Sequence, residues 1–458
     1  MSAPDANHVR GLVKEVTCPN CWERFPPERV KYISTDASLY GDLRLGEQER
    51  RRFLPTRFHP DGRALDAKGS PCHELACPRC HLGVPRVFVE RPAFFVSIFG
   101  SPSSGKSYVL ATMTHALRAT LPRHFSIDFS DADPVANVLL HEGEDRLFSG
   151  KSPCDKGYVW LEKTDPNDPK LYNDVYFGRN GNSTRYYKPF YFQITPFGAH
   201  PLATNSGASS RTLCIYDNAG EHFQPGADTP GNPATQHMAK SSCLLFVYDP
   251  LQEPAFRGQL KSLSDDEQVQ AGVMSRQEVI LAEAAKRIRA GRQLAVGAVL
   301  DKPLIVLVNK YDAWQKLVGD KRLADPWAQR ASENFTVLRV DTIRSVSNAV
   351  RDVLKKYTPA IVATAETFVR PDMVYYLPVS ATGRSPVVVP ADISGINQQP
   401  NQLGYPFGTL KPMWVEVPLL FALSQFGSEG SLGGGIIPYL AAKPTPQPVE
   451  AIQTVGEQ

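Results

Sequence analysis

The sequence lacks any apolar run that reaches the ~18 residues of a membrane-spanning helix. Residues 1–13 also lack the apolar core of a secretory signal. We therefore expect a soluble, cytoplasmic protein without a membrane segment. A strong charge of one sign is missing as well, because the net charge is only +3 over 458 residues. So small a total does not indicate nucleic acid as a partner, although it would not reveal a local basic patch.

Cysteines are too few for a disulfide scaffold, with eight in 458 residues. Four of them form two C-P-x-C pairs, CPNC and CPRC, and in a reducing compartment such pairs more often hold zinc. Two turns of this kind supply tetrahedral sulfur ligation. The sequence therefore predicts structural Zn²⁺ in a zinc-ribbon-like module, with the 55 residues between the pairs folded as an insertion. The expected ligands are Cys18, Cys21, Cys77 and Cys80. A site with three cysteines and a histidine that uses Cys72 or His73 is the alternative.

Composition divides the chain into three regions. Residues 1–90 hold the cysteine pairs and the zinc-ribbon-like module with its insertion. Residues 91–427 alternate short apolar segments with helical patterns. Residues 428–458 are rich in Gly, Pro and Ser and predict a flexible tail, in which the apolar segment 436–440 is able to dock.

The middle region predicts an α/β fold. Several of its apolar segments are continuous, as expected for strands buried on both faces of a parallel sheet. The expected strands are Phe94–Phe99, Tyr187–Ile194, Leu213–Tyr216, Cys243–Tyr248, Leu304–Val308 and Met373–Val379. Helical patterns between them cover Ser107–Ala119, Asp266–Arg289 and Val340–Lys356. This alternation predicts a doubly wound, mostly parallel sheet.

The first motif is GSPSSGKS, which follows an expected strand and opens an expected helix. That context is the one a P-loop requires, since glycines let the backbone N–H groups face one point and the helix N-terminus adds positive potential there. Lys106 is expected to reach the β- and γ-phosphates of a nucleotide, and the Ser107 hydroxyl to bind Mg²⁺. The expected phosphate-binding residues are Gly100, Ser103, Ser104, Gly105, Lys106 and Ser107.

The second motif is D-x-x-G, which begins at Asp217 at the end of an expected strand. Asp217 is expected beside Mg²⁺, and the backbone N–H of Gly220 at the γ-phosphate. Loss of that contact on hydrolysis would release the following loop, which is how switch proteins of this kind work. A threonine from a second switch should also meet Mg²⁺ and the γ-phosphate. Thr184 is the candidate, with Thr164 and Thr195 as competitors.

The third motif is N-K-x-D, at the carboxyl end of the strand Leu304–Val308, where open α/β sheets bind ligands. Asp312 can accept hydrogen bonds from the ring N–H and the 2-amino group of guanine, which adenine does not offer. Asn309 can brace the P-loop, and the stem of Lys310 can cover the base. The dipeptide Ser380-Ala381 follows the last strand, where a backbone N–H can donate to the guanine 6-oxygen. The four motifs together predict GTP rather than ATP.

With these motifs placed, the chain resembles the translation-factor-like, Ras-like class of P-loop GTPases. More narrowly, it resembles bacterial double-GTPase 2 domain proteins, because a zinc-ribbon-like segment precedes the GTPase motifs, Asp249-Pro250 follows the fourth strand and a short helix is expected at Trp414–Leu423. The resemblance implies a GTPase that cycles between GTP and GDP. It also implies a partner, a second GTPase or an effector, in a bacterial conflict or antiviral system.

One departure concerns hydrolysis. Where many relatives place a water-orienting glutamine after the glycine of D-x-x-G, this chain has Glu221, followed by His222 and, two residues later, Gln224. A carboxylate cannot donate to water and repels the γ-phosphate when ionised, so intrinsic hydrolysis is expected to be slow or to need an arginine from a partner. The expected catalytic residues are Lys106, Thr184 and Glu221. The alternatives are a GTP-binding interaction protein with negligible hydrolysis, and a nucleic-acid-associated or ribosome-associated GTPase that reads through the zinc module.

Overall fold

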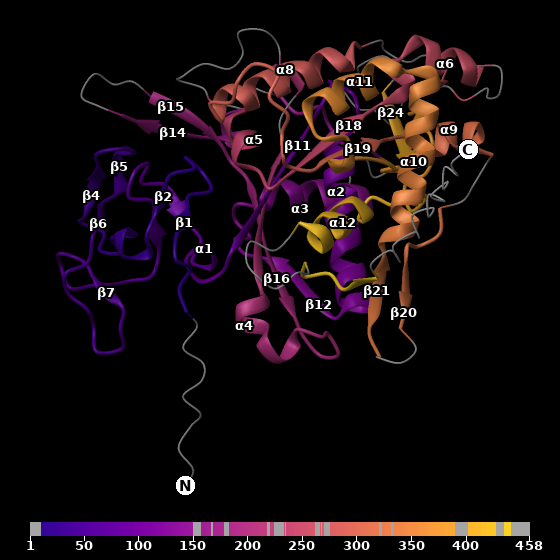
Figure 1. Ribbon diagram of the computed structural model, residues 1–458. Helices are drawn as coiled ribbons and strands as arrows, with labels where there is room; N and C mark the ends of the chain where they lie inside the picture. Colours follow the sequence, from indigo (N-terminus) through magenta and orange to yellow (C-terminus); the bar gives the residue numbers. More distant parts are fainter. Residues whose placement is uncertain are drawn as a thin grey trace, which may run out of the picture.

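The computed structural model shows an N-terminal module beside a larger α/β domain (Figure 1). It describes residues 11–149, 157–165, 168–177, 183–217, 220–223, 233, 235–261, 266, 268–269, 275–319, 323–330, 334–389, 402–426 and 435–440. Within these ranges, no helix has the length and apolar character needed to cross a bilayer.

A seven-stranded sheet forms the centre of the larger domain, in the order β12-β16-β17-β11-β18-β19-β22. Its strands are β11 (Ala93–Gly100), β12 (Ile127–Asp131), β16 (Phe190–Pro196), β17 (Arg211–Asp217), β18 (Cys243–Tyr248), β19 (Leu304–Val308) and β22 (Val374–Pro378). Pairing is parallel from β17 across to β22, whereas β16 is antiparallel to both β17 and β12. Because the parallel strands all end at one edge, the segments after β11, β17, β19 and β22 meet there.

Helices cover both faces of the sheet (Figure 1). One face packs with α2, α3 and α12, and the other, over β18, β19 and β22, packs with α6, α8 and α11. The long helix α10 contributes to both cores. Their bounds are α2 (Lys106–Thr120), α3 (Val138–Phe148), α6 (Pro254–Lys261), α8 (Gln277–Gly291), α10 (Val340–Tyr357), α11 (Pro359–Phe368) and α12 (Val417–Gln425).

The N-terminal module covers the remaining part of the second face. Its buried side chains form one core with residues of β11, β16 and β17, among them Phe95, Tyr191, Cys214 and Tyr216. The module is built from two-residue to five-residue strands: β1 (Val16–Thr17), β2 (Arg24–Phe25), β3 (Lys31–Ile33), β4 (Tyr40–Asp42), β5 (Gly46–Arg50), β6 (Arg52–Phe53), β7 (Ala64–Leu65), β8 (Pro71–Cys72), β9 (Leu75–Ala76) and β10 (Gly83–Val84). The helix α1 (Val87–Glu90) leads from it into β11.

Smaller elements surround these layers. A hairpin of β14 (Tyr172–Tyr176) and β15 (Ser183–Tyr187) docks on the N-terminal module, where the Tyr176 N–H donates to the Arg44 carbonyl at 2.7 Å. Two further three-stranded sheets pair β13 (Tyr158–Val159) with β24 (Leu403–Pro406) and β23 (Val387–Val388), and β20 (Trp327–Gln329) with β21 (Thr336–Arg339) and β25 (Tyr439–Leu440). The short helices are α4 (Ser206–Ser209), α5 (Gln236–Lys240) and α9 (Tyr311–Trp314).

The α/β class and the large sheet agree with the sequence-based prediction, but two details differ. The expected strand Tyr187–Ile194 is two elements, because Tyr187 ends β15 and the sheet strand β16 begins only at Phe190, after Pro189. Helix α8 begins at Gln277 rather than at Asp266. Residues 435–440 are docked on the domain, the arrangement considered for the apolar segment 436–440: Ile436 and Ile437 are buried in the same core as α12, and β25 pairs with β21.

Candidate functional site

The loop between β11 and α2 can be built only with glycine at its two ends. A Cβ on Gly100 would lie 2.3 Å from the Val247 carbonyl oxygen of β18. Gly105 has φ +89° and caps the N-terminus of α2, and a Cβ there would lie 2.6 Å from Nδ2 of Asn309. Ser103 also has a positive φ of 60°. The backbone therefore curls closely around the start of α2, as an anion-binding loop requires.

Polar groups line this loop. The Lys106 ammonium group is almost buried and donates to the carbonyls of Gly100, at 3.1 Å, and Ser101, at 2.7 Å. The hydroxyl of Ser104 is buried and has no hydrogen-bond partner among the described residues. A buried polar atom without a partner is unfavourable, so this hydroxyl is suited to bond a polar ligand.

The D-x-x-G segment lies against this loop. Asp217 ends β17, directly beside Ile98 of β11, and burial raises its pKa to about 6, opposed by the nearby Lys106. Oδ1 of Asp217 is buried without a hydrogen-bond partner in the described structure. A Cβ on Gly220 would lie 2.5 Å from the Pro102 nitrogen, so the two loops touch through their backbones. These groups fit a divalent cation and a phosphate between the two loops.

The structure separates the three threonines weighed for the second switch. The hydroxyl of Thr164 lies 3.2 Å from that of Ser107, at the start of α2. Thr184 instead lies in β15 opposite Val175, in the hairpin that docks on the N-terminal module. Thr195 pairs with Asp128 near the end of β16, and its hydroxyl accepts a hydrogen bond from Arg91. Because β16 is antiparallel to β17, Thr195 lies at the opposite edge of the sheet from Asp217. The geometry thus favours Thr164, and the role expected of Thr184 stays a prediction.

The N-K-x-D segment follows β19 and is hydrogen-bonded directly to the loop between β11 and α2. Nδ2 of Asn309 donates to the Ser104 carbonyl at 2.9 Å, while its Oδ1 is buried without a described partner. Lys310 adopts a left-handed φ of 58° before α9, and its ammonium group pairs with Asp249 at 2.7 Å. The stem of Lys310 is thereby held across the strand ends.

Asp312 and Ser380 come together from the ends of neighbouring strands. The Ser380 hydroxyl donates to Oδ1 of Asp312 at 2.5 Å and accepts from the Gly383 N–H at 2.7 Å. Burial raises the pKa of Asp312, and the hydrogen bond from Ser380 opposes the rise. Ala381 is buried next to them. A chain of hydrogen bonds therefore fixes the orientation of the carboxylate.

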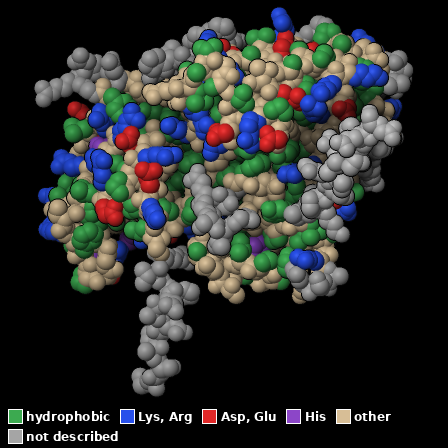
Figure 2. Space-filling view, in the orientation of Figure 1, with side chains coloured by type: hydrophobic (Ala, Val, Ile, Leu, Met, Phe, Trp, Pro, Cys, Tyr) green, Lys and Arg blue, Asp and Glu red, His purple; other side chains and the backbone are tan. Residues whose placement is uncertain are grey.

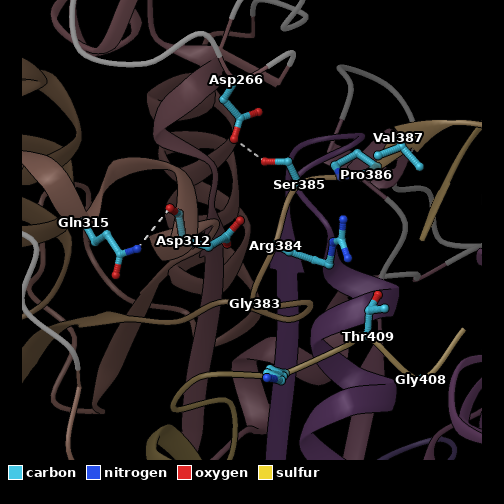
Figure 3. Close-up of a pocket in the computed structure, with 11 residues that line it drawn as sticks. Asp266, Asp312, Gln315, Gly383, Arg384, Ser385, Pro386, Val387, Gly408 and Thr409 are labelled. Carbon is cyan, nitrogen blue, oxygen red and sulfur yellow. Dashed lines mark hydrogen bonds between the residues drawn. The ribbon is translucent and has the colours of Figure 1, made fainter. Parts of the chain in front are cut away.

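Asp312 faces a cavity of about 800 Å³ (Figure 3). Its wall includes Asp266, Arg384 and Lys411, and the Ser385 hydroxyl donates a hydrogen bond to the carboxylate of Asp266. The cavity is polar on several sides, and it is large enough for a planar heterocycle beside the carboxylate.

A buried polar chain that sequence reasoning missed links the phosphate loop to Lys310. The Ser101 hydroxyl lies 2.9 Å from Oε1 of Gln252 and 3.1 Å from Oε1 of Gln277. Nε2 of Gln277 donates at 2.7 Å to the carbonyl of Asp249, the partner of Lys310. The available signal was Gln277, a polar residue at the start of a helix whose other buried residues are apolar. The only sequence signal at Asp249 is the Asp249-Pro250 dipeptide of the family resemblance.

The four cysteines of the two C-P-x-C pairs form one buried cluster whose ligand atoms all lie within 4.8 Å of one another. Sγ of Cys18 lies 3.8 Å from that of Cys80, and Sγ of Cys21 lies 3.6 Å from that of Cys77. A tetrahedral zinc site with Zn–S bonds of about 2.3 Å has sulfur–sulfur edges of about 3.8 Å. Burial raises the pKa of Cys18, whereas hydrogen bonds from Cys18 and Cys21 lower the pKa of Cys77. Four buried sulfur atoms at these separations match the tetrahedral arrangement of a Zn²⁺ site, so the cluster fits that ion.

The segment after Gly220, which holds the candidates for orienting a water molecule, is less completely described. Glu221 and His222 belong to the 3₁₀ turn Gly220–Phe223, but their side chains lie outside the described part of the structure, as does Gln224. Their role in orienting water stays a prediction.

Comparison with known proteins gives distant likenesses. No family model matches the sequence, and no curated protein is similar to it. Among solved structures, the chain is similar to Sup35 complexed with GDP (11% identity, TM-score 0.21, 68% of this chain and 43% of that chain). It is also similar to the GTPase-like domain of Ski7 from S. cerevisiae bound to GTP (14% identity, TM-score 0.22, 64% and 43%) or to GDP and inorganic phosphate (14%, 0.22, 64% and 44%). This chain thus spans less than half the length of those chains. Likenesses this distant decide nothing about function, which has to be argued from the site.

Proposed function

We propose that the protein binds GTP with Mg²⁺ and hydrolyses it to GDP, as a conformational switch that controls a protein partner. The observation that carries the proposal is the hydrogen bond from Asn309 to the Ser104 carbonyl. It joins a phosphate loop built on glycine to an N-K-x-D segment whose Asp312 faces a cavity. A generic phosphate site has no need of this connection, whereas a guanine-nucleotide site does.

Base selection rests on Asp312. Its carboxylate accepts from the N–H and 2-amino groups of guanine, and its position is fixed by Ser380. Lys310, tethered by Asp249, covers one face of the base. An adenine in the same place would leave the buried carboxylate without donors, which is costly.

Phosphate binding rests on the backbone amides of the P-loop and on Lys106, whose contacts with Gly100 and Ser101 would yield to the β- and γ-phosphates. Ser107, Asp217 and Thr164 would hold Mg²⁺. When bound, this ion supplies positive charge to the developing transition state. The N–H of Gly220 is positioned to follow the γ-phosphate, so the segment after it would change with the nucleotide.

The features of the N-terminal module support a structural zinc site rather than a nucleic-acid-binding surface. We propose that Cys18, Cys21, Cys77 and Cys80 hold Zn²⁺. Trp22 of the first knuckle is buried against the sheet and is therefore not available to stack on a base. Figure 2 shows basic and acidic side chains interspersed over the visible face of the module, without a continuous basic stripe.

Glu221 supports a second candidate, a GTP-binding interaction protein with negligible hydrolysis. A carboxylate in the place of a water-orienting amide would leave catalysis to a partner. We propose a second GTPase or an effector as that partner, in a bacterial conflict system, on the strength of the sequence resemblance.

Calorimetric titration with non-hydrolysable GTP and ATP analogues and Mg²⁺ tests the proposal. We expect GTP to bind at least about 100-fold more tightly than ATP. In Asp312→Asn, the new amide would donate to the 2-oxygen of xanthine, so preference should move from the GTP to the XTP analogue. Equal binding of ATP and GTP by the wild type would refute guanine recognition. Single-turnover hydrolysis then separates the two candidates.

A further inference from the structure

The cysteine cluster and the D-x-x-G segment are in direct contact through one tyrosine. Tyr216 is the residue before Asp217 and is fully buried. Its hydroxyl donates at 2.5 Å to the carbonyl of Pro19, which lies between two of the cysteines. It also accepts from the Trp22 indole N–H at 3.2 Å. Burial raises the pKa of Tyr216, so the hydroxyl keeps its proton and remains a donor.

The same tyrosine contacts the helix that follows the D-x-x-G segment. Its ring stacks on His237 of α5, with the ring centroids 4.3 Å apart and the planes 12° from parallel. Nδ1 of His237 lies 2.6 Å from the hydroxyl of Ser97 on β11, which in turn lies 2.6 Å from that of Ser241. Trp22 reaches His237 as well, at a centroid distance of 6.3 Å. The first knuckle therefore touches both the strand that enters the switch segment and the helix that leaves it.

The knuckle itself depends on the cysteines. Trp22 has a left-handed φ of 59°, and its N–H donates to the Cys18 carbonyl at 3.0 Å, which closes the turn. This turn sets the position of both the Pro19 carbonyl and the Trp22 indole. If the four sulfur atoms separate, both partners of the Tyr216 hydroxyl move together.

We propose that the cysteine knuckle is a positioning element of the nucleotide switch, in which Trp22 and Tyr216 fix the end of β17 and thereby the carboxylate of Asp217. This inference rests on the proposed function and deepens it. Neighbouring residues of a strand share one backbone while their side chains point to opposite faces. A ring clamped on one face at Tyr216 therefore holds Asp217 toward the phosphate loop on the other side. By linkage, metal occupancy at the cysteines and Mg²⁺-dependent nucleotide binding must affect each other equally.

The test compares two buried tyrosines of the central sheet whose hydroxyls bond different partners. Tyr216→Phe removes the hydroxyl that bonds the knuckle. Tyr376→Phe removes a similarly buried hydroxyl of the same sheet, one that bonds Glu366 on α11 instead. For each protein, the affinity for a non-hydrolysable GTP analogue is measured over a range of Mg²⁺ concentrations and in EDTA. Zinc release to a chromogenic chelator is timed with and without the magnesium-bound analogue.

We expect Tyr216→Phe to need about fivefold more Mg²⁺ for half-maximal binding, the effect of one ordinary hydrogen bond. Binding in EDTA should be unchanged, and Tyr376→Phe should behave as the wild type. The analogue should slow zinc release in the wild type but not in Tyr216→Phe. A Mg²⁺ requirement equal in the two variants, or a loss of affinity equal with and without Mg²⁺, would overturn the inference.

Two further outcomes are decisive. If Tyr216→Phe does not fold, Trp22→Phe serves instead, because it removes the indole N–H and keeps an aromatic ring. The same raised Mg²⁺ requirement is expected for this variant, and an unchanged requirement contradicts the inference. If the wild type binds no GTP analogue or holds no zinc, the proposed function itself fails, and the inference fails with it.

Discussion

The clearest test of the phosphate loop is the substitution Gly105→Ala. Gly105 has φ +89° and ψ 19°, and a Cβ there would lie 2.6 Å from Nδ2 of Asn309. A left-handed conformation costs an alanine about 1–2 kcal/mol. Displacement of Asn309 would also break its hydrogen bond to Ser104, for about 1 kcal/mol more. The free energy of unfolding should therefore fall by about 2–3 kcal/mol.

Gly319 is a matched control for this change. Its φ of 83° and ψ of 31° nearly equal those of Gly105, but a Cβ there would have no atom of the described residues within 4 Å. Gly319→Ala should lower the free energy of unfolding, measured in urea, by only the backbone strain of about 1–2 kcal/mol. Its nucleotide affinity should be unchanged. Gly105→Ala should lose affinity about tenfold or more, because the link between base and phosphate segments is broken.

Nucleotide affinity separates the effect of backbone strain, which both variants share, from the effect of the lost Asn309–Ser104 bond. Equal nucleotide affinity in Gly105→Ala and Gly319→Ala would refute the role given to the Asn309–Ser104 bond. As an internal check, Asn309→Ala makes room for the added Cβ. The double variant should therefore be less destabilised than the sum of the two single changes.

Three further predictions follow from the same geometry. Thr164→Ala should weaken Mg²⁺-dependent binding of a GTP analogue several-fold, whereas Thr184→Ala should not, as measured by calorimetry; the reverse order would restore Thr184 as the switch threonine. Burial raises the pKa of Asp217 to about 6, so the folded protein without nucleotide holds this proton more tightly than the unfolded chain does. The free energy of unfolding should therefore rise as pH falls from 6 toward 4, while Mg²⁺-dependent binding should decline below about pH 6. Binding that depends on pH in the wild type but not in Asp217→Asn would assign the effect to this carboxyl group. Removal of metal from the cysteine cluster with a strong chelator should lower the melting temperature, since ligation of buried thiolates contributes folding energy, and an unchanged melting temperature with metal loss confirmed by elemental analysis would contradict a structural role.

The positions of the P-loop motif and of the N-K-x-D motif in the fold were predictable because each is a local pattern attached to an apolar strand. Leu304–Val308 reads as a buried strand, and the segment after it must lie at the carboxyl edge of the sheet. The same reasoning placed Gly100 and Asp217 correctly at the ends of β11 and β17. Local spacing thus carried most of the candidate site.

The partners of these residues were not predictable in the same way. Thr164 and Thr184 both sit in polar stretches without periodicity, and only the tertiary structure shows which one meets Ser107. Gln277 and Asp249 meet across 28 positions of sequence, a distance at which no local pattern operates. The break at Pro189 was visible in the sequence, since proline interrupts a central strand, but the apolar residues on both sides concealed it.

The shared core between the N-terminal module and the sheet limits how the protein can be divided. Phe95, Tyr191, Cys214 and Tyr216 are buried in one core with side chains of the module. A fragment that begins near residue 91 would present these aromatic and thiol side chains to water as one continuous apolar surface. Such a surface favours aggregation. A truncated protein would therefore report the exposure of the sheet's buried face, and not the effect of removing an independent domain.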